Sequence, residues 1–186
     1  YAKGEGVQLD VVKALSLYKK ACDAGILGAC YNIGVVYDDG DGVSQNKQKA
    51  LKIYEKACES EHIPSCYNLG LLYDDGDGVS QNKEKALVIY KKACDGGNLS
   101  ACTHSGIIYQ FGNGVKQDKQ KAFKLYSKAC DGGNASGCHN LGLLYYNGDG
   151  IRQDRSIANK LFGKACDGGH SSGCKNYRIL NEQGVS

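Results

Sequence analysis

The sequence has no Trp and no Met, a single Pro and only three Phe among its 186 residues. Large side chains are therefore scarce, and any core that the chain forms must be thin. No run of apolar residues approaches the length that crosses a membrane, so no membrane span is expected. No signal peptide is present, and the absence of even a starting Met fits a secretory signal that was removed upstream.

The chain also lacks a large excess of charge of either sign. The chain carries 23 Lys and Arg against 20 Asp and Glu, a formal net charge of +3. A surface that binds nucleic acid needs a basic face or stripe, and a near balance of charges argues against one. We therefore expect no nucleic-acid partner.

What the sequence does have is an internal repeat with a period of 36 residues. The same pattern of Gly, Tyr and Cys recurs in four full units, residues 31–66, 67–102, 103–138 and 139–174. A fixed period of this length is typical of a solenoid, in which each unit buries its apolar face only against its neighbours. The sequence therefore predicts one repeat domain over residues 1–186 rather than several globular domains.

Both ends of the chain fall out of phase with the repeat. Residues 1–30 match the later part of a unit whose first helix is missing, and residues 175–186 match the opening of another unit. This last segment also departs from the pattern, since Arg178 replaces a Gly and Asn181 replaces a Tyr. We expect the chain to be a piece of a longer array.

All ten cysteines occupy two positions of the repeat. They make five pairs that lie eight residues apart: Cys22 and Cys30, Cys58 and Cys66, Cys94 and Cys102, Cys130 and Cys138, Cys166 and Cys174. Sequence alone allows many pairings, but the period requires every unit to pair alike, and the nearest partner lies across one short loop. No Cys-x-x-Cys motif suggests a zinc site or a redox motif. We therefore expect five disulfides and an oxidising location, secreted or periplasmic.

Each unit is predicted to form two helices. The first carries apolar residues at helical spacing, such as Leu69, Leu72 and Tyr73. The second is predicted to begin after Asn82, a position that is Asn or Asp in every unit, as an N-cap requires. Its buried stripe consists of Ala86, Tyr90, Ala93 and Cys94.

Two features of the first helix need an explanation. The loop residue before it, Asn98, Asn134, His62 or His170, can accept a hydrogen bond at the helix N-terminus. Gly70 and its equivalents lie inside the helix, although Gly costs about 1 kcal/mol there relative to Ala. We interpret these glycines as places where a neighbouring helix approaches closely.

Gly76-Asp77-Gly78-Val79 and its equivalents separate the two helices, and we interpret this segment as a turn. A phosphate-binding loop would need a strand before the glycines, and no strand signal is present. The acidic segment 38–42 misses the spacing of a hand-type calcium loop, and Gln110 and Phe111 replace its acids in a later unit.

The unit follows the pattern A-x-x-x-L-G-x-x-Y-x-x-G-x-G-V and then D-x-x-K-A-L-x-x-Y-x-K-A-C. This pattern resembles the Sel-one-like repeat, a relative of the tetratricopeptide repeat, over the whole chain. The cysteines eight residues apart resemble the Helicobacter cysteine-rich protein (Hcp) family of secreted repeat proteins. The resemblance implies an all-α fold, a right-handed α/α superhelix (solenoid) whose first helices line a concave groove for protein or peptide binding. Some members are also described as penicillin-binding proteins or weak β-lactamases.

A hydrolase has one motif in its favour. Ser44 to Lys47 and Ser80 to Lys83 both match Ser-x-x-Lys, the nucleophile motif of serine β-lactamases. However, the serine position holds Gln8, Lys116 and Arg152 in the other units. No Ser-Asp-Asn or Lys-Thr-Gly partner motif occurs. We therefore assign no catalytic residue.

The four histidines, His62, His104, His139 and His170, replace Asn or Tyr at positions of the repeat. We interpret them as variants of those positions and expect no metal site and no cofactor.

The residue two positions after the second cysteine of each pair is an amide or an imidazole in every unit: Asn32, Asn68, His104, Asn140 and Asn176. Counted from the buried Leu and Tyr positions, it points away from the core and would form a ladder along the groove. Asn donates and accepts hydrogen bonds, which suits an extended peptide backbone. The alternative is that these residues favour helix starts or join neighbouring units. Beside them, Tyr67, His139 and Tyr146 are expected to supply aromatic selectivity.

We therefore predict a monomeric, secreted repeat scaffold that binds a protein or peptide segment in its groove, in an interaction between a bacterium and its host. The alternative is a penicillin-binding protein or weak β-lactam hydrolase, with β-lactam-like small molecules as ligands.

Overall fold

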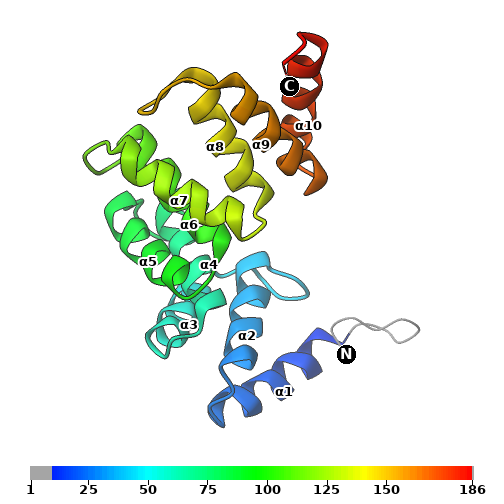
Figure 1. Cartoon of the computed structure of the whole chain (residues 1–186). Helices are drawn as coiled ribbons and strands as arrows, with labels where there is room; N and C mark the ends of the chain where they lie inside the picture. Colours follow the sequence, from blue (N-terminus) through cyan, green and yellow to red (C-terminus); the bar gives the residue numbers. More distant parts are fainter. Residues whose placement is uncertain (1–9, 186) are drawn as a thin grey trace. The chain divides into compact units, whose positions relative to one another are not determined.

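The computed structural model describes residues 10–185, and these residues form helices and turns without a strand (Figure 1). The helices are α1 (Val11–Asp23), α2 (Leu27–Asp39), α3 (Lys47–Glu59), α4 (Ile63–Asp75), α5 (Lys83–Asp95), α6 (Leu99–Phe111), α7 (Lys119–Asp131), α8 (Ala135–Asn147), α9 (Arg155–Asp167) and α10 (Ser171–Glu182). This arrangement confirms the predicted fold class, an all-α repeat of the solenoid class. None of the helices in residues 10–185 is long and apolar enough to cross a membrane.

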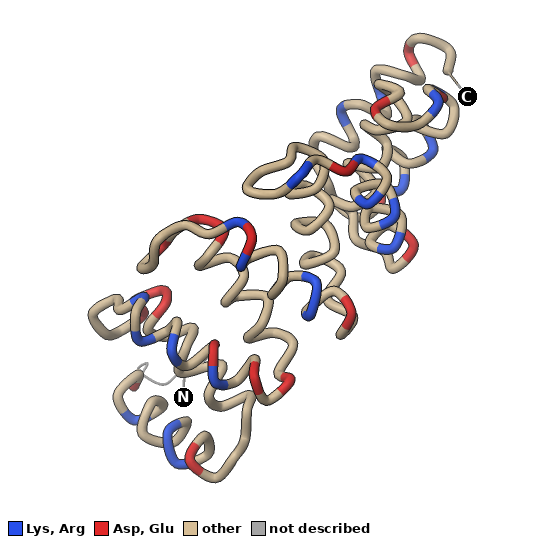
Figure 2. Tube along the Cα trace, turned by 90° about the vertical axis from the view of Figure 1, so that its left-hand side faces the viewer, with Lys and Arg blue, Asp and Glu red and all other residues tan. Residues whose placement is uncertain are grey.

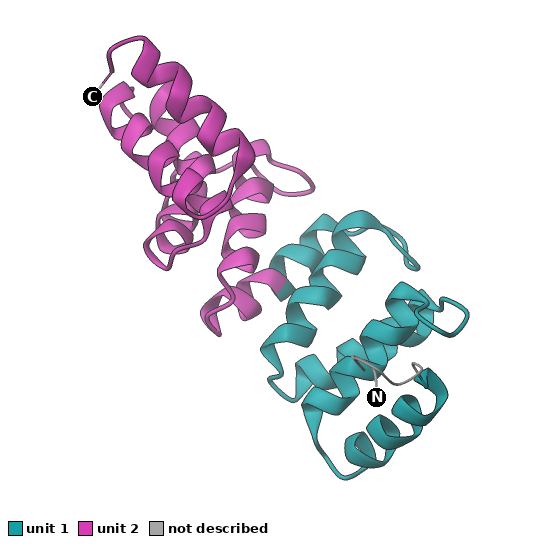
Figure 3. Ribbon diagram, turned by 90° about the vertical axis from the view of Figure 1, so that its right-hand side faces the viewer, with its two compact units in different colours: residues 1–89 teal, residues 90–186 magenta. Residues whose placement is uncertain are grey.

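The chain divides into two compact units, residues 1–89 and residues 90–186, with the boundary inside α5 (Figure 3). Within residues 1–89, α1 packs on α2, α2 on α3, and α3 on α4. Within residues 90–186, α6 to α10 pack consecutively, and α8 also touches both α6 and α10. The single repeat domain proposed from the sequence stays a prediction.

The second helices begin as the sequence predicts. Asp10, Asn46, Asp118 and Asp154 are N-caps, and the side chain of each accepts a hydrogen bond from the backbone N–H three residues later. Asn82 accepts in the same way from Lys85 N, at 2.8 Å. Each cap satisfies one of the N–H groups that a helix start leaves without an intrahelical partner.

The first helices begin less uniformly. Asn98, Asn134 and His170 cap α6, α8 and α10 through their side chains, as expected. His62 is the N-cap residue of α4, but its side chain accepts no capping hydrogen bond, so this expectation was wrong. Its Nδ1 instead lies 2.9 Å from Ser65 Oγ, the side chain of the third helical residue.

The turn between the two helices of a unit depends on two local features. Gly40, Gly76, Gly112 and Gly148 end the first helices in the left-handed conformation, with φ of 74°, 74°, 69° and 68°. A Gln directly before the cap of α3, α5, α7 and α9 then donates its side-chain N–H to a carbonyl of the last turn of the first helix. These bonds run from Gln45 to Asp38, from Gln81 to Asp74, from Gln117 to Gln110 and from Gln153 to Tyr146. The Gly-x-Gly segments are therefore structural turns, as predicted.

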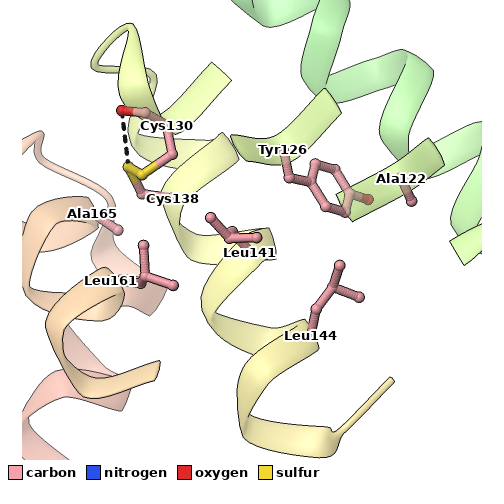
Figure 4. Packing of buried hydrophobic residues seen from close by; sticks show 8 residues of the cluster. All are labelled: Ala122, Tyr126, Cys130, Cys138, Leu141, Leu144, Leu161 and Ala165. Carbon is pink, nitrogen blue, oxygen red and sulfur yellow. Dashed lines mark hydrogen bonds between the residues drawn. A yellow bond between two sulfur atoms is a disulfide. The ribbon is translucent and has the colours of Figure 1, made fainter. Parts of the chain in front are cut away.

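The core is thin and built from small residues around one aromatic ring per unit. The best-defined cluster contains Ala122, Tyr126, Cys130, Cys138, Leu141, Leu144, Leu161 and Ala165, which come from α7, α8 and α9 (Figure 4). Tyr126 is fully buried, as are Tyr54 and Tyr90 at the equivalent position, and Phe162 is 1% exposed. A ring from the second helix thus lies under the first helices beside it.

The glycines inside the first helices make room for these rings. A Cβ atom added to Gly106 would lie 2.5 Å from Tyr126 Cε1, and one added to Gly142 would lie 2.7 Å from Phe162 Cε1. Both distances are far below van der Waals contact. Close approach is therefore the reason for these glycines, and the neighbour that approaches is an aromatic side chain of the next helix.

Five disulfides join the end of each second helix to the first turn of the next first helix. The structure pairs Cys22 with Cys30, Cys58 with Cys66, Cys94 with Cys102, Cys130 with Cys138, and Cys166 with Cys174. The Cα atoms of the pairs are 4.4 to 4.8 Å apart, which is within the range that a disulfide spans. Each bond closes a short loop and limits the freedom of the unfolded chain.

Candidate functional site

The five residues of the predicted ladder lie in the second turns of α2, α4, α6, α8 and α10, and all are half-buried. Asn68 shows why they are not fully exposed. Its Nδ2 donates to Tyr54 Oη at 3.2 Å, and the Tyr54 ring is fully buried. The position therefore faces partly into the contact between helices rather than wholly away from the core, because the tyrosine of the preceding second helix reaches beneath it.

In residues 1–89, a polar link joins three helices. The Tyr54 hydroxyl donates to Asp38 Oδ2 on α2 at 3.4 Å while it accepts from Asn68 on α4. Lys47 Nζ lies 2.7 Å from Asp38 Oδ1 and 2.8 Å from Asp77 Oδ2. Burial opposes the charge of Lys47, but the hydrogen bonds to Asp38 and Asp77 raise its pKa above the ordinary value.

Residues 90–186 contain a second polar link with different chemistry. The Tyr126 hydroxyl donates to Gln110 Oε1 at 2.8 Å, and Gln110 Nε2 donates to Asp149 Oδ2 at 3.1 Å. Lys119 Nζ lies 2.5 Å from Asp149 Oδ1 and lowers the pKa of that carboxyl group through this hydrogen bond. Gln110 occupies the repeat position that Asp38 occupies in the first link. A neutral amide therefore replaces a carboxylate in this second link.

The ladder position of α6 is occupied by His104 rather than by an amide. Its ring stacks on Tyr90, with the ring centroids 5.1 Å apart and an angle of 27° between the planes. This imidazole is therefore also engaged with the buried ring of a second helix.

At the C-terminal repeat, the ladder residue contacts a histidine. Asn176 Nδ2 lies 3.3 Å from His139 Nε2, and His139 stacks on His170 with a centroid distance of 4.4 Å. Burial, and after it the neighbouring His170, lowers the pKa of His139. His170 Nδ1 accepts a hydrogen bond from Gly173 N at 3.1 Å and so caps α10.

A cleft of about 200 Å³ lies beside Asn176, between α8, α9 and α10. Its lining residues are Leu143, Tyr146, Asn147, Phe162, Asn176, Ile179 and Leu180. The structure thus brings together two of the predicted site residues, Tyr146 and Asn176. Sequence reasoning missed the other five, although the replacement of the usual Tyr by Phe162 is a visible departure from the repeat.

The predicted aromatic position directly before the ladder residue is a tyrosine in both first helices of residues 1–89. Tyr67 is half-buried on α4, next to Asn68 in the sequence. Tyr31, at the equivalent position of α2, packs its ring 6.0 Å from that of Tyr54 and 5.5 Å from that of His62. Tyr31 thus packs on the same ring whose hydroxyl group bonds Asn68.

The Ser-x-x-Lys motifs lie at the turns that lead into the second helices. Ser44 and Ser80 are exposed and lie in the turns before the N-caps. The lysines of the motifs, Lys47 and Lys83, form ion pairs with Asp38 and Asp74. A catalytic lysine base must be neutral, whereas the hydrogen bonds to Asp38 and Asp77 raise the pKa of Lys47.

The side chains that could ligate a metal ion and the distribution of charge bear on which ligands the chain could bind. No group of three or more His, Cys, Asp or Glu side chains in residues 10–185 could hold a metal ion. Lys and Arg outnumber Asp and Glu in residues 90–186, whereas acids slightly exceed bases in residues 1–89. Figure 2 shows the basic and acidic residues along the trace in blue and red. The near balance of the whole chain thus conceals two units of opposite net charge.

Disulfide-stapled helix pairs with a polar position repeated on each first helix define a helical-repeat scaffold. The chain belongs to the Sel1 repeat family, whose model matches residues 1–26, 28–62, 63–98, 99–134 and 135–170. The full units of the family model begin three or four residues before the boundaries that we drew from the sequence, and they coincide with the helix pairs.

Solved structures agree with this family. A protective antigen of uropathogenic Escherichia coli, c5321, has 31% identity and a TM-score of 0.87, and the match covers 92% of this chain and 37% of that one. A Sel1 repeat protein of Oxalobacter formigenes has 32% identity and a TM-score of 0.90 over 97% of this chain and 74% of that one. The cysteine-rich protein HcpB of Helicobacter pylori has 36% identity and a TM-score of 0.55 over 69% of this chain and 92% of that one.

The chain thus spans about 37% of the length of the Escherichia coli antigen. A comparison with curated proteins gave no match.

Proposed function

We propose that this protein is a secreted scaffold that binds an extended segment of a partner protein along the ladder side of its first helices. The single observation that carries the proposal is the recurrence of a half-buried Asn or His at one position of α2, α4, α6, α8 and α10. A half-buried amide keeps some of its surface for a ligand while contacts such as that of Asn68 with Tyr54 fix its orientation. Such preorganisation favours binding, because little side-chain freedom remains to be lost.

Family membership supports a scaffold rather than an enzyme, since Sel1 repeats are protein-interaction modules. Family membership does not identify the partner protein. One structural relative is described as a protective antigen of a uropathogenic bacterium, which is consistent with a role at the boundary between a bacterium and its host. Five disulfides favour an oxidising compartment, such as the periplasm or the extracellular space. We also propose that the protein acts as a monomer.

The test is a panel of synthetic nonapeptides, with binding measured by fluorescence anisotropy. Each peptide has an acetylated N-terminus, an amidated C-terminus and a Gly and Asn background with one variable central residue. The double variant Asn68→Ala and Asn140→Ala should bind the panel about 10- to 100-fold more weakly, because each lost hydrogen bond is worth roughly 0.5 to 1.5 kcal/mol.

The control is Tyr54→Phe, which removes the internal partner of Asn68 but keeps the amide. It should weaken binding much less than the double variant, with helicity unchanged in both. Equal binding by the double variant and the parent protein would show that the ladder only joins neighbouring repeats, and that another face binds the partner.

A further inference from the structure

The cleft beside α10 lies where two residues depart from the repeat. At the equivalent place in residues 1–89, the Tyr54 hydroxyl joins Asp38 to Asn68 and fills the space with a hydrogen-bonded link. In the last unit, Phe162 has no hydroxyl group and Tyr146 stands where Asp38 stands. The link cannot form there, and Asn176 contacts His139 instead.

The result is an apolar cleft with amides among its lining residues. Phe162 and Leu180 are each 1% exposed and belong to the core, whereas Ile179 is 36% exposed. Asn147 is exposed and Asn176 is half-buried. An apolar group that enters the cleft would therefore find carbon surface, while amide groups remain close by for a peptide backbone.

The size of the cleft decides which class of ligand it takes. A volume of about 200 Å³ is smaller than the 300 to 1,000 Å³ that is typical of small-molecule pockets. It is suited to a single large side chain. Two of its lining residues, Tyr146 and Phe162, are aromatic, and aromatic rings gain free energy by packing edge-to-face or offset on one another.

Charge around the cleft indicates what should stand next to that side chain. The Arg155 guanidinium carbon lies 5.3 Å from the centroid of the Tyr146 ring. Lys175 and Arg178 are exposed neighbours of Asn176 and Ile179 on α10, and α8 carries no charged side chain. The acids close to these bases are themselves paired: Glu182 lies 3.8 Å from Arg178, and Asp149, two residues after Asn147, lies 2.5 Å from Lys119.

We infer that this cleft is a specificity pocket for one aromatic side chain of an extended segment of a partner protein, with acidic residues on either side of the aromatic one. The inference rests on the proposed function and names the chemistry of its ligand at one site. The ladder supplies contacts to the backbone that do not depend on sequence, whereas the pocket selects the segment and sets its register.

The experiment uses the nonapeptide panel with Glu-x-Glu at its centre, where x is Phe, Leu, Ala or Lys, and a Lys-Phe-Lys peptide. The Glu-Phe-Glu peptide should bind roughly 10- to 100-fold more tightly than the Glu-Ala-Glu peptide, as burial of a large apolar side chain predicts. It should also bind more tightly than Lys-Phe-Lys, by a factor that decreases as salt is added.

Three variants test whether the preference for Phe arises at the cleft. Ile179→Asp places a charge at the cleft and should remove the preference for Phe. Ile157→Asp is the matched control, because Ile157 is 38% exposed on α9, a similar fraction, but does not line the cleft. The double variant Phe162→Tyr and Tyr146→Asp rebuilds the hydrogen-bonding groups that residues 1–89 already contain, and it should also remove the preference.

The outcomes separate this inference from the proposed function. Binding that depends on Asn68 and Asn140 but shows no preference for Phe overturns the pocket and leaves the scaffold in place. A Phe preference that Ile179→Asp abolishes supports the pocket, even if the ladder variant binds normally and the ladder proposal fails. An equal loss in Ile179→Asp and Ile157→Asp, or no binding by any peptide, overturns the pocket.

Discussion

Replacement of Gly34 by Ala should destabilise the protein through one contact. Gly34 lies inside α2, and a Cβ atom added there would lie 2.8 Å from Tyr54 Cδ1, 3.0 Å from Cζ and closer still to Cε1. The ring cannot easily move away. It is fully buried, and its hydroxyl group is held by Asp38 and Asn68 from two different helices.

The magnitude follows from two opposing terms. Ala is favoured over Gly inside a helix by about 1 kcal/mol. Inserting a methyl group into a well-packed core costs typically 1 to 3 kcal/mol. Because the ring is held in place, we expect the upper half of that range and a net destabilisation of about 1 to 2 kcal/mol. For a chain of this length, that corresponds to a fall in Tm of roughly 2 to 8 °C.

The assay is urea unfolding followed by far-UV circular dichroism, with the disulfides intact. Gly28→Ala is the control in the same helix, because an added Cβ atom meets nothing within 4 Å there. Gly28→Ala should be neutral or stabilising, whereas Gly34→Ala should lower the urea midpoint. If Gly34→Ala were as stable as Gly28→Ala, the glycine would not be required by packing, and the explanation of the repeated glycines would fail.

Three further predictions concern covalent structure, pH and catalysis. Peptide mapping without reduction should recover the five bonded cysteine pairs, and free thiols or bonds between different pairs would contradict this. Reduction should lower the free energy of unfolding by roughly 2 to 3 kcal/mol per bridge by the chain-entropy model. Burial and His170 lower the pKa of His139 in the folded protein below the ordinary value of about 6.5. As the pH drops, the unfolded chain therefore binds a proton at this histidine before the folded chain does. Stability should fall as the pH drops from about 6.5 towards the folded pKa. His139→Thr should flatten that part of a stability-against-pH curve, and an unchanged slope would exclude His139 as its source. Replacement of both Ser44 and Ser80 by Ala should leave any β-lactam turnover nearly unchanged, and a collapse of turnover with an intact fold would favour a serine hydrolase.

Much of the fold was predictable because the residues that each structural feature requires recur in several units of the repeat. One Asn or Asp at a helix start is a weak signal, but the same residue type at Asp10, Asn46, Asn82, Asp118 and Asp154 identifies an N-cap, and the structure confirms it. His62 was misjudged because a cap depends on side-chain orientation. Ser65 lies close enough to engage the histidine nitrogen, and only the folded structure shows this.

The candidate site was predictable in position but not in environment. The period places Asn68 and its equivalents on one side of the first helices, but it does not show that Tyr54 reaches beneath them. That contact joins residues 14 positions apart on different helices. Likewise, the stack of His139 on His170 and the cleft beside Asn176 depend on how α8, α9 and α10 pack, which no local pattern encodes.

The sequence by itself determined the repeat length, the helix pairs, their caps and the pairing of the cysteines, because all of these depend on interactions between residues close together in the chain. Only the tertiary structure decided what surrounds each repeated position. A ring such as Tyr54 or Phe162 contacts the first helices on both sides of it. A polar link surrounds the Tyr54 hydroxyl, whereas a cleft lies beside Phe162, where Tyr146 also replaces the acid. That outcome depends on side chains from three helices at once, so it is fixed only when the helices pack.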